Sequence, residues 1–126
     1  MSKPRIEHVK ATASAQEISL ILERDGCVVI DRLLSEAFCD RILDDLHPWM
    51  NKVPEGDGEW LGFKTRRTHG LVAKSPAVRE NLCHPLILDI LDRVIGPWCD
   101  SFQLSSSSIT SIGPGESNQE VHRDAL

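Results

Sequence analysis

The sequence predicts an α+β fold, with helices in the first part of the chain and strands in the last. Helical apolar spacing recurs up to residue 97, whereas the stretch beyond it has no helical period. Helices and strands that are separated along a chain are typical of α+β domains. Its 126 residues, 40% hydrophobic and 26% charged, suit one globular domain. We expect residues 1–13 to form a flexible lead-in and residues 14–126 to form that domain.

The first helix is predicted at 15–25. Ser14 and Glu17 have the spacing of a capping box, in which each side chain satisfies a backbone amide at the start of the helix. Apolar residues follow at helical spacing, and Gly26 is suited to end the helix. The β-rich run at 27–30, "CVVI", predicts a short buried strand directly after it.

A second amphipathic helix is predicted from Ser35 to Lys52. Its apolar residues recur every four positions and acidic residues occupy the other face, which favours a helix with one buried side. A loop rich in glycine, proline and acidic residues follows at 53–62, and 63–72 is predicted to be extended or irregular. The apolar residues at this spacing are Phe38, Ile42, Leu46 and Met50.

Two further helices are predicted within 75–97. Ser75 is suited to cap the first of them, with Pro76 at its first position, where proline is favoured. Pro85 opens the second helix, whose apolar residues share one face. Gly96 and the proline after it end the helical part of the chain.

The remaining sequence predicts strands. Apolar residues alternate with polar ones at 102–104 and again, on another register, at 109–112, which indicates two strands or one strand with a bulge. The run at 113–117, "GPGES", predicts a turn. A last strand is predicted at 119–126.

Charge and hydropathy exclude several partners. The net charge is −5, and the only dense basic run, Lys64–Arg67, is too short to favour nucleic acid or an anionic membrane. No run approaches the roughly 20 apolar residues that span a bilayer. The N-terminus lacks the apolar segment of a signal peptide, so we expect a cytoplasmic protein.

The four cysteines are widely spaced, and no two of them form a CxxC pair. A zinc site built from them is therefore not expected. In a reducing compartment we expect them to be small buried hydrophobic residues. They are Cys27, Cys39, Cys83 and Cys99.

His122 and Asp124 form the most chemically suggestive motif. Side chains two apart on a strand point to the same face, so an imidazole and a carboxylate would lie together. Non-haem iron(II) is bound by two histidines and one carboxylate on one face of its coordination sphere, with other positions open. The pair therefore predicts two of three iron ligands, although a surface histidine and aspartate at this spacing are also common.

A protein-kinase catalytic loop is an alternative interpretation of the triplet His-Arg-Asp at 122–124. That interpretation needs a glycine-rich loop, a strand lysine and an asparagine shortly after the triplet. The only matching lysine is Lys74 in "LVAK", and no GxGxxG precedes it. The triplet also comes after a turn rather than a helix, so the iron interpretation is favoured.

The chain resembles the phytanoyl-CoA dioxygenase family of iron(II)/2-oxoglutarate oxygenases, from about Ile18 to Asp124. The matching stretches are "ERDGCVVI", "LCHPLILDILDRVIGP" and, most specifically, "PGESNQEVHRD". The resemblance implies a double-stranded β-helix, or jelly roll, with helices packed outside it. It also implies oxidation of a small molecule coupled to decarboxylation of 2-oxoglutarate. By motif position, His122 and Asp124 would bind Fe(II), and Gln119 would lie near the cosubstrate.

The sequence departs from that family pattern beyond the motif. A second histidine ligand and an arginine for 2-oxoglutarate come later in these proteins, and neither position is present here. Among the upstream histidines only His69, beside Arg66 and Arg67, is a candidate third ligand. The Lys64–Arg67 run either binds an acidic group or is a solvated basic loop.

We therefore expect an incomplete barrel, since a jelly roll needs about eight strands. The chain is interpreted as a truncated oxygenase that is inactive alone. The alternatives are a non-enzymatic remnant or binding module, and one half of a split oxygenase. Unpaired strand edges predict self-association.

Overall fold

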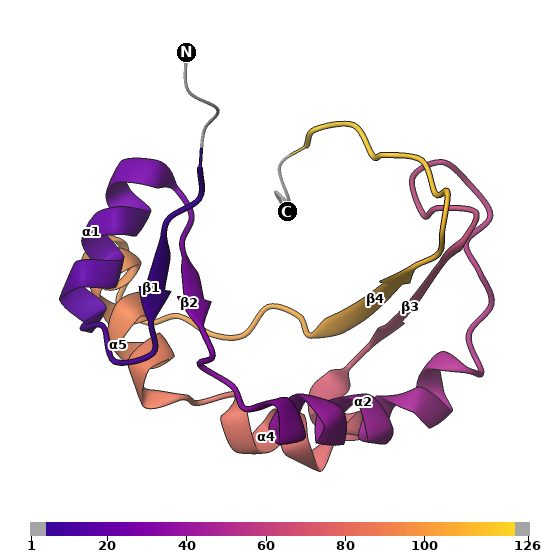
Figure 1. The fold of residues 1–126 in the computed structure, drawn as a ribbon, viewed down its shortest axis with the longest axis horizontal. Helices are drawn as coiled ribbons and strands as arrows, with labels where there is room; N and C mark the ends of the chain where they lie inside the picture. Colours follow the sequence, from indigo (N-terminus) through magenta and orange to yellow (C-terminus); the bar gives the residue numbers. More distant parts are fainter. Residues whose placement is uncertain (1–4, 123–126) are drawn as a thin grey trace.

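The computed structural model describes residues 5–122, which form an arc of helices and two small sheets (Figure 1). Strands β1 and β2 pair in parallel, and strands β3 and β4 pair in antiparallel, as two separate two-stranded sheets. The elements in chain order are β1 His8–Lys10, α1 Ala15–Asp25, β2 Val29–Asp31, α2 Glu36–Met50, β3 Thr65–His69, α3 Leu71–Lys74, α4 Pro76–Asn81, α5 Pro85–Val94, the 3-10 turn η1 Gly96–Trp98 and β4 Ser108–Ile112.

The helices confirm the capping signals of the sequence. The side chain of Ser14 accepts a hydrogen bond from the amide of Glu17 at 3.2 Å, and Gly26 ends α1 with a left-handed φ of 75°. Ser35 caps α2 in the same way, with the amide of Phe38 at 3.2 Å. No helix within residues 5–122 is long and apolar enough to cross a membrane.

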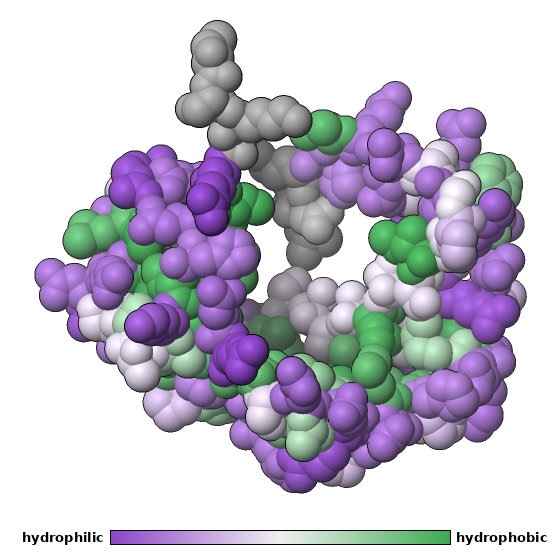
Figure 2. Space-filling view, viewed as in Figure 1, coloured by the Kyte–Doolittle hydropathy of each residue, from purple (hydrophilic) through white to green (hydrophobic). Residues whose placement is uncertain are grey.

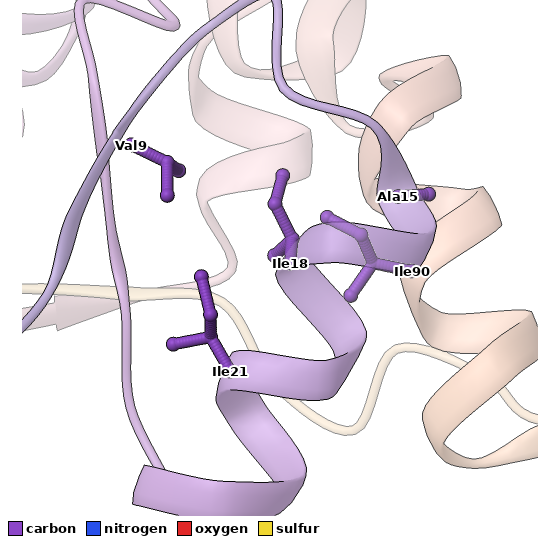
Figure 3. Packing of buried hydrophobic residues seen from close by; sticks show 5 residues of the cluster. All are labelled: Val9, Ala15, Ile18, Ile21 and Ile90. Atoms are coloured by element: carbon purple, nitrogen blue, oxygen red, sulfur yellow. The ribbon is translucent and has the colours of Figure 1, made fainter.

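The main hydrophobic core joins α1, α5 and the first sheet at one end of the arc. Figure 3 shows its side chains converging from β1, α1 and α5. Ile18 is fully buried at its centre. The buried members of this cluster are Val9, Ala15, Ile18, Ile21 and Ile90.

The prediction of a flexible lead-in over 1–13 was wrong for His8–Lys10. These residues form β1, and Val9 lies in register with Ile30 and is buried in the core. The sequence pattern missed this strand because one apolar residue between two polar ones is too short to be recognised. The strict order of helices before strands is also not found, since β1 and β2 flank α1.

The second sheet lies at the other end of the arc, with α2 packed against β3. Its register pairs Thr65 with Ile112 and His69 with Ser108. The strand at 109–112 is thus confirmed, and the extended stretch predicted at 63–72 is confirmed over Thr65–His69. It was wrong for residues 71–72, which begin the short helix α3. No strand forms at 102–104 or at 119–122, because no neighbouring backbone within residues 5–122 pairs with them.

The mixed helical and strand composition is confirmed, and the described residues contain two small sheets rather than a closed barrel. The jelly roll therefore stays a prediction. Several large hydrophobic side chains are exposed, and Figure 2 shows hydrophobic residues along the inner edge of the arc. The four cysteines are also exposed, so their predicted burial was wrong. Cys39 lies on α2, and the other three lie in the turns and irregular segments between elements.

Helix α2 is tied to the start of α4 by one carboxylate. Asp45 Oδ2 accepts hydrogen bonds from the hydroxyl of Ser75 at 2.7 Å and from the amide of Ala77 at 3.2 Å. These two hydrogen bonds hold the pKa of Asp45 below its usual range, and the bond from Ser75 has the larger effect. Desolvation acts in the opposite direction but is the smaller effect. The contact is therefore present at neutral pH and is lost as the pH falls through the folded-state pKa.

We expect Ser75→Ala to lower the free energy of unfolding by about 1–2 kcal/mol. Ser75 is fully buried, donates to Asp45 and also caps α4 by accepting from the amide of Val78 at 3.0 Å. Ser35→Ala, which removes a cap but no side-chain pair, is the matched control and should cost less. Urea unfolding measures both changes, and an equal or smaller loss for Ser75→Ala would contradict the double role.

Candidate functional site

The predicted site residues lie in the segment after β4. This segment returns along a loop at 56–64 that precedes β3 (Figure 1). Gln119 and His122 are described, whereas Asp124 lies outside the described residues. The structure therefore shows how two of the three predicted residues are placed.

Glu116 fastens the segment to the start of β3. One of its carboxylate oxygens accepts from the amide of Lys64 at 2.5 Å and from the hydroxyl of Thr65 at 2.9 Å. Beside it, the amide of Gly113 donates to the carbonyl of Lys64 at 2.8 Å. The hydrogen bond from the Lys64 amide is the main cause that lowers the pKa of Glu116, so the carboxylate is ionised at neutral pH.

The loop at 56–64, which faces the segment after β4, makes a tight turn. Gly62 has a left-handed φ of 83°, and its amide donates to the carbonyl of Gly58 at 2.7 Å. A Cβ on Gly62 would stand 2.7 Å from Glu116 Oε2, so the close approach also requires glycine. Arg67 Nη1 donates to the carbonyl of Leu61 at 2.7 Å and ties the loop to β3.

Trp60, in the turn at 59–61 of this loop, contacts both described site residues. Its carbonyl accepts from Gln119 Nε2 at 2.6 Å. Its indole ring and the imidazole of His122 lie 4.6 Å apart between centroids, at an interplanar angle of 56°. A small hollow of about 170 Å³ lies beside these contacts and is lined by Trp60, Thr65, Arg67, Glu116 and Gln119 among others.

The hydrogen bond of His122 determines its tautomer. Nδ1 lies 2.8 Å from the carbonyl oxygen of Glu120. A carbonyl oxygen only accepts, so Nδ1 carries the hydrogen, and the neutral ring has its lone pair on Nε2. Histidines that bind metals are commonly held by such a bond from the other ring nitrogen. The chemistry of this side chain therefore fits a metal ligand.

The structure does not bring His69 to this site. His69 ends β3 at the register position opposite Ser108, whereas Glu116 binds at the Thr65 end. Four residue steps along the strand separate these ends by roughly 13 Å. Within residues 5–122 no group of three histidine, cysteine or acidic side chains is placed to hold a metal ion.

The basic side chains of the Lys64–Arg67 run contact other parts of this chain. Lys64 Nζ donates to the carbonyl of Pro114 at 3.2 Å, and Arg66 lies 3.8 Å from a carboxylate oxygen of Glu55. Together with the contact of Arg67 to the loop, these interactions support a structural role for the run.

Comparison with known proteins decides between the interpretations of the motif. The family model of phytanoyl-CoA dioxygenase (PhyH) matches residues 22–126, which include the His-Arg-Asp triplet. The chain belongs to the phytanoyl-CoA dioxygenase family. The membership assigns the triplet to an oxygenase family rather than to a kinase loop.

Curated relatives of this phytanoyl-CoA dioxygenase family member are fungal dioxygenases. The dioxygenase aneA of Aspergillus aculeatus is 30% identical over 130 residues, covering 97% of this chain and 44% of aneA. The multifunctional dioxygenase prhA of Penicillium brasilianum is 30% identical, covering 98% of this chain and 43% of prhA. The Fe(II)/2-oxoglutarate-dependent dioxygenase nvfF of Aspergillus novofumigatus is 28% identical, covering 98% and 45%. The chain thus spans less than half of the length of these relatives.

Sequence reasoning missed Glu116 and Trp60. Both lie close to glycines in runs that look like ordinary turns, "GPGES" and "GEWLG". Their partners are more than 50 positions away along the chain, so no local pattern could have found them.

Proposed function

We propose that this chain carries part of the active site of an iron(II)/2-oxoglutarate-dependent dioxygenase that oxidises a small molecule. In this proposal His122 and Asp124 are two of the three iron ligands, and Gln119 lies beside 2-oxoglutarate. Membership of the family and the name of the relative nvfF support the chemistry. The observation that carries the assignment of His122 is its Nδ1–H bond to the carbonyl of Glu120, because metal-binding histidines are commonly held by such a bond from one ring nitrogen.

Iron(II) with 2-oxoglutarate and oxygen would supply the oxidising power for attack on a C–H bond. The residues of this chain would bind and orient. His122 presents Nε2 in a fixed tautomer, and Gln119 is held by the carbonyl of Trp60. Glu116 holds its part of the segment against the start of β3, which anchors the chain shortly before Gln119 and His122.

We propose that the third ligand, a histidine, and the arginine that pairs with 2-oxoglutarate come from residues other than these 126. His69 lies at the far end of β3, which supports this proposal. The same additional residues would complete the jelly roll around the second sheet. The substrate is proposed only as a small molecule, since its pocket would be built mainly by those residues.

Two alternative functions remain proposals: a non-enzymatic binding module, and one half of a split oxygenase. Their support is the distance of His69 from Glu116 along β3, since this histidine does not complete a ligand set with His122. Self-association through unpaired strands is a proposal of the same kind. It is supported by the two-stranded second sheet and by the exposure of Ile112 on β4.

The test of the proposed function is release of succinate from 2-oxoglutarate in the presence of iron(II) and ascorbate. The 126-residue chain alone should release succinate no faster than free iron in buffer, because two ligands leave the metal open. Residues 1–126 joined to the remaining C-terminal part of aneA, which would supply the missing ligand, should release it well above that level. Stoichiometric succinate from the 126-residue chain would contradict the ligand assignment, and His69→Ala would then show whether His69 is the missed ligand.

A further inference from the structure

Trp60 contacts the predicted site with two different parts of the residue. Its backbone carbonyl accepts the hydrogen bond of Gln119 at 2.6 Å, and its indole ring lies 4.6 Å from the imidazole of His122. A side-chain substitution therefore removes the contact to His122 and keeps the hydrogen-bond acceptor for Gln119. The two contacts can be separated by experiment.

The place of Trp60 is set by the strand behind it. The loop that carries it is closed by the bond from Gly62 to Gly58 and is tied to β3 through the bond from Arg67 to the carbonyl of Leu61. Glu116 fastens the opposite segment to the same end of β3. The loop that carries Trp60 and the segment that carries His122 are thus both held by hydrogen bonds to β3.

The indole ring does not belong to the hydrophobic core. Trp60 is 57% exposed, and it lies outside the cluster formed by β1, α1 and α5. A single exposed aromatic residue is not informative by itself, so the role of Trp60 rests on its contacts. Aromatic pairs at this separation and tilt have a preferred geometry, so the indole restricts the rotation of the imidazole.

The geometry points to Trp60 as a positioning residue of the proposed iron site: its ring fixes the plane of the His122 imidazole, and its carbonyl fixes Gln119. This inference rests on the proposed function. With the bond from Nδ1 to Glu120, the ring contact sets the direction in which Nε2 points. A ligand held before the metal arrives loses less rotational freedom on binding, and groups that hold metal ligands are typically worth about 10–100-fold in metal affinity.

The first test is NMR of the His122 imidazole in the metal-free 126-residue chain. In the wild type, the ring protons should be shifted by the ring current of Trp60, and the nitrogens should show one tautomer, with hydrogen on Nδ1. Trp60→Ala should move both signals towards those of a freely rotating imidazole, and Trp60→Phe should keep most of the wild-type pattern. Trp98→Ala is the matched control, since Trp98 is 86% exposed and lies in η1. Unchanged His122 signals in Trp60→Ala would overturn the inference.

The second test is titration of the same proteins and of His122→Ala with Co(II), followed at the Gln119 and Glu120 resonances. Affinity should fall about tenfold in Trp60→Ala, stay near the wild-type value in Trp60→Phe and be unchanged in Trp98→Ala. Amide shifts of β3 and β4 report whether the variants keep their fold. Equal affinity of Trp60→Ala and wild type would overturn the positioning role alone. Equal Co(II) affinity of the wild type and His122→Ala would instead overturn the proposed metal site. It would also overturn the role of Trp60 toward that site.

Discussion

Replacing His122 or Asp124 by alanine is expected to lower 2-oxoglutarate turnover by more than about 100-fold in residues 1–126 joined to the C-terminal part of aneA. Even groups that only support a ligand are worth about 10–100-fold, and each of these residues is proposed to bind the iron itself. The measurement is succinate release with and without added iron(II).

His69→Ala is the matched control for this pair. It removes an imidazole from the far end of β3 and should leave turnover within about twofold of the wild type, as expected for a surface position. Normal turnover in Asp124→Ala would contradict the carboxylate assignment. Normal turnover in His122→Ala would contradict the assignment of His122 as an iron ligand.

We expect Ile18→Ala to lower the free energy of unfolding by about 2–5 kcal/mol, the usual cost of removing a large buried aliphatic side chain. Ile18 has no exposed surface and is surrounded by residues from β1, α1 and α5. A loss of this size is a large fraction of the stability of a small domain. Urea unfolding followed by circular dichroism measures it.

Leu20→Ala supplies the control on the same helix. Leu20 is 59% exposed, so this change should cost within about 0.5 kcal/mol. An equal cost at the two positions would show that α1 does not bury the face seen in the structure.

Local signals in the sequence predicted the helices well. Ser14, Ser35 and Ser75 each cap the helix that comes next, since capping depends on residues only two or three positions apart. The strands were predicted less well because a strand depends on a partner elsewhere in the chain. Val9 became part of β1 by pairing with β2, whereas the alternating run at 102–104 found no partner among the described residues.

The motif of the proposed site could be recognised in the sequence, whereas the residues that contact it could not. The spacing of His122 and Asp124 and the position of Gln119 could be recognised as a motif, because the chemistry needs those groups close together in sequence. The residues that hold them could not be recognised. Glu116 and Trp60 act across the gap between the C-terminal segment and the loop before β3, and the sequence carries no sign of that approach.

The most direct measurement is the location of a bound divalent metal on the 126-residue chain. Under anaerobic conditions, Mn(II) should broaden the NMR signals of His122, Gln119 and the indole of Trp60 first, because the metal would lie beside these groups. The broadening should disappear in Asp124→Ala. Broadening that is centred on His8, His47 or His69, or that survives in Asp124→Ala, would show that His122 and Asp124 do not form the metal site.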